Sequence, residues 1–327
     1  MKQYVIRRIL TDFFVLFGVS ILLYSICRMM PSDYVENMIA GNQNIIKEVE
    51  VRMREAYGLD KSIVEGYISW FCGAIRGDFG ISFVYQKPVT EIILENMAPT
   101  VFLAGIAFII QFLIAIPFGI LSAHYQYSVL DYIIVTLAIF SISLPSFFIA
   151  AVLKRIFSIE LGILPISGMI TARANYVGIE YFLDLAKHFV LPIVVLVITG
   201  VGSRLKYVRM NMLEVLNMDY VCMARAKGLP EHIVLWKHAF RNTLIPIVTM
   251  IGSMIPSLFS GAVVIEGLFG LKGLGQIALN AVYMGDIPYL MGFSMFIAYM
   301  TLLGTLVSDI LYVVVDPRVS YERKHYE

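Results

Sequence analysis

Six apolar segments, each long enough to cross a lipid bilayer as a helix, constrain this chain more than any other feature. A helix needs roughly 20 residues to cross the hydrocarbon core of a bilayer. Charged residues make up only 15% of the 327 residues, too few for a soluble domain of this length. The apolar segments do not alternate in polarity as barrel strands do, which leaves helices to satisfy the backbone in lipid. We therefore expect an all-α polytopic membrane protein.

The predicted spans are residues 9–27, 100–123, 132–153, 189–205, 244–265 and 289–314. The first is too long for the apolar region of a signal peptide and lacks a small-residue cleavage site, so we expect a retained helix. The expected organisation is an N-terminal part with the first transmembrane helix (1–30), an extracytoplasmic cap (31–98), a core with helices two to six (99–314) that includes a cytoplasmic loop (206–243), and a cytoplasmic tail (315–327).

Basic residues near the span ends predict the orientation, because they favour the cytoplasmic side. With six spans, three basic groups fall on the same side: Lys2, Arg7 and Arg8; Arg204, Lys206, Arg209, Arg225, Lys227, Lys237 and Arg241; and Arg318, Arg323 and Lys324. Lys154 and Arg155 fall on the other side and oppose this assignment weakly. Both termini are therefore predicted to be cytoplasmic, in an inner-type (plasma) membrane.

The cap predicted between the first two spans has helical patterning at 45–56 and 63–75, with breaks at Gly58 and Gly77. We expect a small folded unit, because six aromatic residues can bury surface: Tyr57, Tyr67, Trp70, Phe71, Phe79 and Phe83. Two further outer loops are predicted at 154–187 and 266–288.

The spans lack the residues of a proton-coupled carrier or an intramembrane enzyme. Their ionisable residues lie toward the ends, where charge costs little: Asp12, Arg28, Asp131 and Asp309. No GxxxxGK[ST] nucleotide motif, HExxH or GxSxG appears, and the cysteines Cys27, Cys72 and Cys222 match no metal-site spacing. A net charge of +1 gives no electrostatic argument for nucleic acid. We expect no catalysis, metal or cofactor in this chain.

Prolines recur in or beside the spans, namely Pro117, Pro145, Pro192, Pro246 and Pro256, and each removes a backbone donor and favours a kink. These kinks are either simple packing features or hinges in the wall of a pathway. In the second case the polar residues near them are candidates to line it: Ser141, Ser143, Ser146, Ser253, Ser257 and Ser260.

A polar, basic, helix-prone insert at 219–246 interrupts the apolar segments. It predicts two short helices around Gly228 and Pro230, since glycine suits a helix end and proline a first turn. In the second helix Ile233, Leu235 and Trp236 interleave with basic residues. Such an amphipathic helix either docks into a groove on a cytoplasmic partner or lies on the membrane surface.

Several motifs, in order along nearly the whole chain, carry a family resemblance. The insert contains Ala224-Arg-Ala-Lys-Gly-Leu-Pro230 and His238-Ala-Phe-Arg-Asn-Thr-Leu-Ile-Pro246. Other matching stretches are 4–10, 57–61, 76–82, 161–165, 264–275 and 316–318. The chain resembles the permeases of binding-protein-dependent ABC importers, in the dipeptide, oligopeptide and nickel branch, and within it the B-type peptide permease subunits. It departs from the general motif at Cys222-Met223-Ala224, where that motif has Glu-Ala-Ala.

The resemblance implies a type I importer transmembrane fold and a permease subunit that forms half of a pathway for di- or oligopeptides. It implies pairing with a second, homologous permease, two cytoplasmic ATPases that bind ATP and Mg, and an extracytoplasmic peptide-binding protein. The residues implied to couple the ATPases are Ala224, Arg225, Ala226, Lys227, Gly228, Leu229, Pro230, Glu231, His238 and Arg241. Three alternatives stay open: nickel or another metal chelate as the cargo, a stand-alone carrier or channel, and a membrane anchor for a signalling complex.

Overall fold

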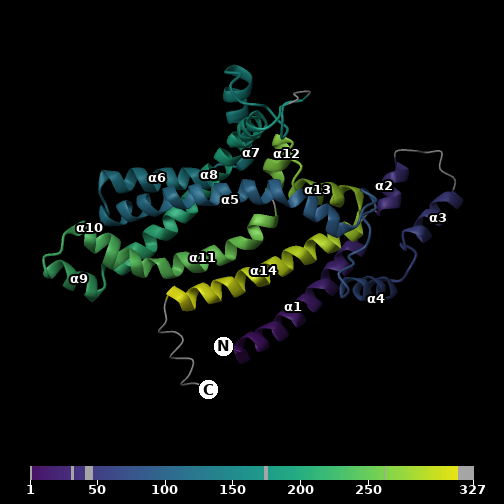
Figure 1. Ribbon diagram of the computed structural model, residues 1–327, viewed down its shortest axis with the longest axis horizontal. Coiled ribbons are helices and arrows are strands. Elements are labelled where there is room, and N and C mark those ends of the chain that lie inside the picture. Colours follow the sequence, from purple (N-terminus) through teal and green to yellow (C-terminus); the bar gives the residue numbers. More distant parts are fainter. Residues whose placement is uncertain (1, 31–32, 41–46, 173–175, 261, 316–327) are drawn as a thin grey trace. The chain divides into compact units, whose positions relative to one another are not determined.

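The computed structural model describes residues 2–30, 33–40, 47–172, 176–260 and 262–315, drawn as helices and loops in Figure 1. Within those ranges the regular structure is helical, apart from one isolated bridge between Ile81 and Pro88. In chain order the elements are α1 (Lys2–Arg28), α2 (Tyr34–Ala40), α3 (Lys47–Ala56), α4 (Ile63–Ala74), α5 (Val89–His124), α6 (Val129–Ser143), α7 (Ser146–Leu153), η1 (Lys154–Glu160), α8 (Ile179–Leu216), α9 (Asp219–Ala226), α10 (Glu231–Ile233), η2 (Val234–Ala239), α11 (Phe240–Ser260), α12 (Val263–Phe269), α13 (Leu274–Met284) and α14 (Ile287–Val315). The predicted all-α class is confirmed.

Four helices are long and apolar enough to cross a membrane by themselves, and six spans result if each of two bent pairs counts as one. The four are Thr11–Arg28, Val89–His124, Ile179–Leu216 and Ile287–Leu311; the pairs are Val129–Ser143 with Ser146–Glu160, and Glu231–Leu244 with Pro246–Ser260. Each of the six predicted segments overlaps one of these helices or pairs.

Two helices are much longer than their predicted spans. α5 has 36 residues and α8 has 38. At 1.5 Å per residue each is roughly 55 Å long, whereas the hydrocarbon core is roughly 30 Å thick. The extra length lies outside the predicted spans. α5 begins at Val89, inside the segment expected to be the cap, and α8 extends on both sides of its predicted span into segments expected to be loops.

The third predicted span, 132–153, is wrong as a single helix. α6 ends at Ser143, Leu144 is extended at ψ 129°, and the chain bends by 97° before α7. The residue before a proline is biased away from helical geometry, which explains the break at Pro145. Pro192, by contrast, lies inside α8 without ending it.

The fifth predicted span, 244–265, is also divided. α11 begins earlier, at Phe240, and ends at Ser260, and α12 begins at Val263. The loop expected at 266–288 contains α13, whose 11 residues are too few to span a membrane. Gly285 ends α13 with φ at +72°, a left-handed conformation that favours glycine.

The chain forms two compact units, and the first comprises Met1–Thr100, Phe259–Val263 and Lys272–Leu303. Its described core contains buried side chains from the first turns of α5 and from α13 and α14, including Val89, Ile92, Leu274, Ala281 and Tyr289. The helices predicted at 45–56 and 63–75 are present as α3 and α4, with residues 45 and 46 outside the described ranges. The predicted breaks are confirmed at Gly58 (φ +65°) and Gly77 (φ +83°).

The aromatic residues of the expected cap contact one another and also the first transmembrane helix. Tyr57 and Phe83 meet within the segment at 4.7 Å between ring centroids, and Tyr67 and Trp70 at 6.3 Å. Tyr67 and Trp70 pack on Tyr24 of α1 as well, at 5.7 Å and 6.5 Å. Tyr24 is 7% exposed, so this segment buries its rings partly on the first transmembrane helix.

A buried carboxylate ties the end of the same segment to the turn between α13 and α14. Asp286 has no exposed surface and accepts hydrogen bonds from the backbone N–H of Phe83 (3.0 Å) and Val84 (3.2 Å). It also accepts one from the Ser82 hydroxyl. Because a buried carboxylate must be hydrogen-bonded, this contact positions residues 82–84 against a turn about 200 residues later in the chain.

The second unit comprises Val101–Leu258, Val264–Leu271 and Gly304–Glu327. α6 and α8 pack closely because Gly202 has no side chain: a Cβ there would lie 2.2 Å from the backbone oxygen of Ala138. Small residues allow such close approach between membrane helices. Ser141 of α6 reinforces the contact, since its hydroxyl donates to the Ile198 carbonyl and accepts from the Gly202 N–H at 3.2 Å.

Candidate functional site

The insert after α8 forms a helical hairpin whose turn is set by local sequence. α9 begins at Asp219 and ends at Ala226, with an acidic residue in its first turn and Arg225 in its last, as the helix dipole favours. Gly228 follows with φ at +74°. Pro230 caps α10, one position earlier than predicted. The predicted break at Gly228 and Pro230 is thus confirmed.

The prediction of a separate short second helix is wrong. α10 continues through the π-helical segment η2 into α11, so the stretch from Glu231 is continuous with the following span. The helix pair Glu231–Leu244 and Pro246–Ser260 bends by 43° where Pro246 begins its second half. The hairpin is therefore continuous with a bent helix pair that is apolar enough to span the membrane if it counts as one span.

A buried stripe on each helix of the hairpin anchors it to the rest of the unit. Val221 and Ala224 of α9 and Val234 and Leu235 of η2 are at most 8% exposed. They share one apolar cluster with Ile120 and Ala123 of α5, Val208, Met212, Val215 and Leu216 of α8, and Ile247 of α11. The hairpin is thus packed as a rigid part of the fold.

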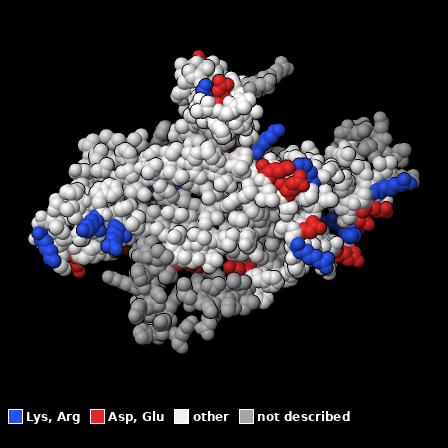
Figure 2. Space-filling view, in the orientation of Figure 1, with Lys and Arg blue, Asp and Glu red and all other residues white. Residues whose placement is uncertain are grey.

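The opposite face of the hairpin leaves large apolar side chains exposed beside basic ones. The exposed fractions are 56% for Met223, 49% for Trp236, 41% for Met218 and 36% for Tyr220 and Leu229. Arg225, Lys227, Lys237 and Arg241 are exposed as well. Figure 2 shows basic side chains gathered at the end of the unit formed by α9 and α10. Exposed apolar groups flanked by charge indicate a surface that contacts a protein or a membrane.

Of the three apolar residues predicted for the amphipathic second helix, only Trp236 is exposed, at 49%. Leu235 is 8% exposed and belongs to the buried cluster, and Ile233 is half-buried. The helical period of 3.6 residues puts neighbouring positions on different faces, so the three side chains cannot share one surface. The ring of Trp236 lies 5.5 Å from that of Phe240, edge to face.

An ionic link joins the two helices of the hairpin to α5. Arg225 donates to Glu231 at 2.8 Å, and the His124 ring nitrogen lies 3.5 Å from the same carboxylate. Arg225 and Glu231 are each 39% exposed, so this link contributes at most about 1 kcal/mol. Burial raises the pKa of the Tyr220 hydroxyl, an effect opposed by a hydrogen bond with Asn242.

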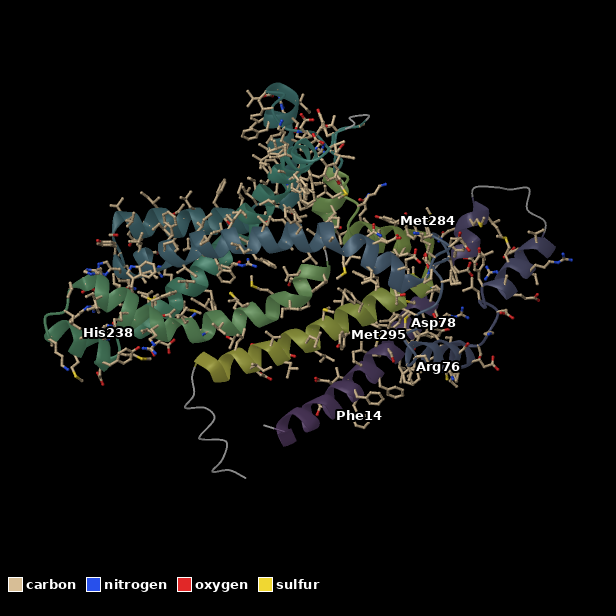
Figure 3. All side chains as sticks on the ribbon, viewed as in Figure 1. Phe14, Arg76, Asp78, His238, Met284 and Met295 are labelled. Atoms are coloured by element: carbon tan, nitrogen blue, oxygen red, sulfur yellow. The ribbon has the colours of Figure 1, made fainter. Side chains whose placement is uncertain are left out.

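The remaining residues implied by the resemblance are spread over the hairpin. Ala224 is buried, Ala226, Lys227, Leu229 and Pro230 are exposed around the turn, and Arg241 is exposed at the start of α11. His238, labelled in Figure 3, is half-buried, and its carbonyl accepts a hydrogen bond from Asn242 at 3.1 Å. The structure brings these residues together on one hairpin with Arg225 and Glu231.

The structure contains a buried ion pair that was not among the site residues predicted from the sequence. Arg209 of α8 donates to Asp131 of α6 from Nε at 2.9 Å and from Nη2 at 2.8 Å. Asp131 also accepts from the Ser122 hydroxyl and from the Tyr127 N–H at 3.0 Å. Its side chain is 4% exposed. The pair links the turn between α5 and α6 to α8. Val208 and Met212, on either side of Arg209 in α8, belong to the apolar cluster that anchors the hairpin.

The candidate pathway serines differ in burial where their side chains are described. Ser141 is buried between α6 and α8, and Ser143 donates to its own helix at Ile139, 2.9 Å away. Ser146 and Ser260 are half-buried and Ser257 is exposed, while the side chain of Ser253 lies outside those described. Ser141 is a helix-packing residue, and the role of the others as pathway residues stays a prediction.

The described residues contain no group of three or more His, Cys, Asp or Glu side chains that could hold a metal ion. The apolar helices define a polytopic membrane protein, and its packed hairpin leaves apolar and basic side chains exposed. The model of one transporter family matches residues 115–321, and that of its N-terminal part matches residues 1–104. The chain belongs to this family, the binding-protein-dependent transport system inner membrane components.

Two curated relatives are similar along their full length. The oligopeptide transport system permease protein AppB of Bacillus subtilis is 36% identical over 322 residues, which cover 98% of this chain and 100% of the relative. The glutathione transport system permease protein GsiC of Escherichia coli is 31% identical over 322 residues with the same two coverages. The similarity thus includes the α2–α4 segment and the hairpin as well as the apolar helices.

Proposed function

We propose that this chain is a permease subunit of an ATP-driven ABC importer and forms half of a translocation pathway for di- or oligopeptides. The observation that carries this proposal is the full-length similarity to an oligopeptide permease. Because a second relative is a glutathione permease, peptide is favoured over a nickel chelate as the cargo. An extracytoplasmic binding protein delivers the cargo, and the segment 31–98 is the part proposed to receive it.

The hairpin is proposed to be the contact for a cytoplasmic ATPase. Its exposed apolar face offers Met223 and Trp236 as contact residues, with Arg225 and Lys227 at the rim. Two ATPases would bind ATP and Mg, one on this hairpin and one on that of a second, homologous permease. This chain contributes no hydrolytic step. Because α10 is continuous with α11, displacement of the hairpin would tilt the spanning helix and reorient the pathway.

Copurification tests this proposal. We expect the tagged chain, purified from its native membranes in mild detergent, to bring with it a second multi-span permease and one or two ATPases, identified by mass spectrometry. Peptides added to vesicles that contain this assembly and its binding protein should then be taken up only with ATP. A chain that elutes alone and monodisperse, or that transports without ATPases, would contradict the proposal and favour a stand-alone carrier.

The proposed orientation predicts opposite labelling of two cysteines. Cys72 on α4 and Cys222 on α9 are both exposed free thiols, while Cys27 is half-buried. In a Cys27→Ser background, Cys72 is expected to react with a membrane-impermeant maleimide in intact cells with an accessible outer face. Cys222 should react only after the membrane is opened, because it lies on the cytoplasmic hairpin. A mass-tag gel shift on single-cysteine variants gives the measurement. Labelling of Cys222 in sealed cells would contradict the proposed orientation.

A further inference from the structure

A charged side chain of the second unit lies among the apolar parts of two long helices. Arg204 of α8 is half-buried and lies near the end of the predicted span 189–205. The Cζ atom of its guanidinium lies over two rings of α5, at 4.9 Å from the centre of Phe108 and 5.9 Å from that of Phe112. Both rings lie near the middle of the predicted span 100–123. The charge of Arg204 is therefore held at the level of apolar residues.

The side chain of Arg204 extends toward the middle of α8. Arginine near the end of a span commonly reaches out to the headgroups, where its charge costs little. Arg204 instead donates from Nη1 to the carbonyl of Gly200, one turn earlier, at 2.9 Å. A Cβ on Gly200 would lie 2.9 Å from this Nη1, so the guanidinium is level with Gly200. The charge is thus directed into the span and away from its nearer end.

The described residues supply no counter-charge to this guanidinium. Arg209, five residues later, pairs with Asp131 at 2.8 Å, whereas no Asp or Glu in the described part of the chain pairs with Arg204. The Nε atom is enclosed without an acceptor from those residues, while Nη2 is not enclosed and has no partner among them either. Charged side chains within membrane spans almost always face the bundle interior or a water-filled cavity, and they mark substrate pathways.

A neighbouring amide fixes the place of Arg204 but does not neutralise it. Gln111 of α5 is 3% exposed, and its Nε2 donates to the Leu196 carbonyl of α8 at 2.6 Å. A Cβ on Gly200 would lie 2.3 Å from this Nε2, so the absence of a side chain there lets Gln111 and Arg204 converge. Because the amide is uncharged, the missing negative charge must come from outside the described residues.

The site also adjoins the helix that continues the hairpin. The hydroxyl of Tyr207, three residues after Arg204, donates to the Pro246 carbonyl of α11 at 3.4 Å. Pro246 begins the second half of the pair that bends by 43°. A ligand held by Arg204 would therefore lie within about one helical turn of this bend.

The chemistry of the site fits a carboxylate. A guanidinium presents a planar fork of N–H donors that matches the two oxygens of a carboxylate. Every peptide with a free C-terminus carries one carboxylate, whatever its side chains, and a carboxylate that leaves water is costly unless it is paired. A lipid phosphate lies with the headgroups, whereas this guanidinium is directed toward Gly200, away from the end of the span.

We propose that Arg204 binds the C-terminal carboxylate of the peptide cargo inside the translocation pathway and contributes to the selection of cargo. This inference rests on the proposed importer function. Nη2 is the open donor that pairs with a carboxylate oxygen, and Gln111 acts as a positioning residue.

Two forms of one cargo test this role. The full importer, with its binding protein, second permease and ATPases, is placed in vesicles. ATP-driven uptake is measured for one peptide as the free acid and as its C-terminal amide, chosen so that the binding protein binds both. Because the binding protein is the same in every assembly, its own preference cancels when variants are compared. We expect Arg204→Met to lower the ratio of acid to amide uptake roughly tenfold or more, as for a lost hydrogen bond between charged groups.

Two further variants complete the test. Lys206→Met is the matched control, because Lys206 is exposed two residues later on α8 and its loss removes the same charge. Its ratio of acid to amide uptake should equal that of wild type. Arg204→Lys keeps the charge but loses the planar fork, so we expect an intermediate ratio, and this result does not require the Met variant to assemble well.

The outcomes separate this inference from the importer function. No ATP-driven uptake of either form by wild type would overturn the importer function and this inference with it. Uptake by wild type with an unchanged ratio in both Arg204 variants would overturn the inference alone. Equal loss of both forms, with less of the second permease copurified, would show that Arg204 pairs with that subunit and would also overturn the inference.

Discussion

Replacing Asp131 by alanine is expected to lower the free energy of unfolding by about 3–5 kcal/mol, the typical cost of breaking a buried ion pair by removing one partner. Asp131 is 4% exposed and binds Arg209 through both of its oxygens, at 2.8 Å and 2.9 Å. Without the carboxylate, the Arg209 guanidinium stays half-buried with no counter-charge, and the hydrogen bonds of Ser122 and Tyr127 are lost. Thermal or denaturant unfolding of the purified protein in detergent measures the change.

Replacing both partners separates the cost of an unpaired buried charge from the cost of lost packing. The combination Asp131→Leu with Arg209→Met should recover most of the loss, because replacing both partners by apolar groups is often neutral. Glu160→Ala serves as a matched control: Glu160 pairs with Arg155 at 2.9 Å, but the two side chains are 53% and 77% exposed. That variant should change stability by less than about 1 kcal/mol. Equal losses at Asp131 and Glu160 would contradict the role assigned to burial.

Gly228→Arg is expected to abolish peptide uptake while the protein still reaches the membrane at its normal level. Gly228 is exposed at the hairpin turn, and nothing lies within 4 Å of where its Cβ would be. A bulky cation there does not clash inside the chain but obstructs the surface proposed to bind the ATPase. Uptake of a labelled oligopeptide and the amount of copurified ATPase, each relative to wild type, give the measurement.

The control for Gly228→Arg must carry the same backbone strain. Gly228 has φ at +74°, so any other residue there costs roughly 1–2 kcal/mol. Gly162 has φ at +63° and equally open surroundings, but it follows η1, outside both the hairpin and the segment 31–98. Gly162→Arg should retain most of the uptake, and Gly228→Asn, which tolerates this conformation, should retain part. If Gly162→Arg loses uptake equally, strain or instability is the cause and the docking role of the hairpin loses its support.

The elements that sequence reasoning located are those with a local physical cause. Ser62 and Glu65 form a capping box at the start of α4, close to the start predicted from the apolar pattern. Gly228 ends α9 because glycine adopts a left-handed conformation at little cost. Pro145 lies at a kink because the residue before it avoids the helical region. Each of these signals acts within a few residues, so it can be read along the chain.

The contacts that sequence reasoning missed join residues far apart in the chain. Ser128, three residues before Asp131, marks the start of α6, yet nothing in the sequence indicates that Arg209, 78 residues later, binds the same carboxylate. Asp286 and Ser82 are separated by 204 residues. The lengths of α5 and α8 were underestimated for a related reason: hydropathy marks the part of a helix that lipid requires, whereas packing decides how far the helix continues beyond it.

The sequence by itself determined that this protein is a helical membrane protein, which family it resembles, and where the hairpin turns. Hydrophobicity and helix-ending residues act through short-range physics that is independent of the rest of the fold. Only the tertiary structure decided that Leu235 is buried while Trp236 is exposed, that Ser141 joins two helices, and that Asp131 neutralises Arg209. These outcomes depend on which surfaces meet when the helices pack, because burial and ion pairing are properties of a three-dimensional neighbourhood.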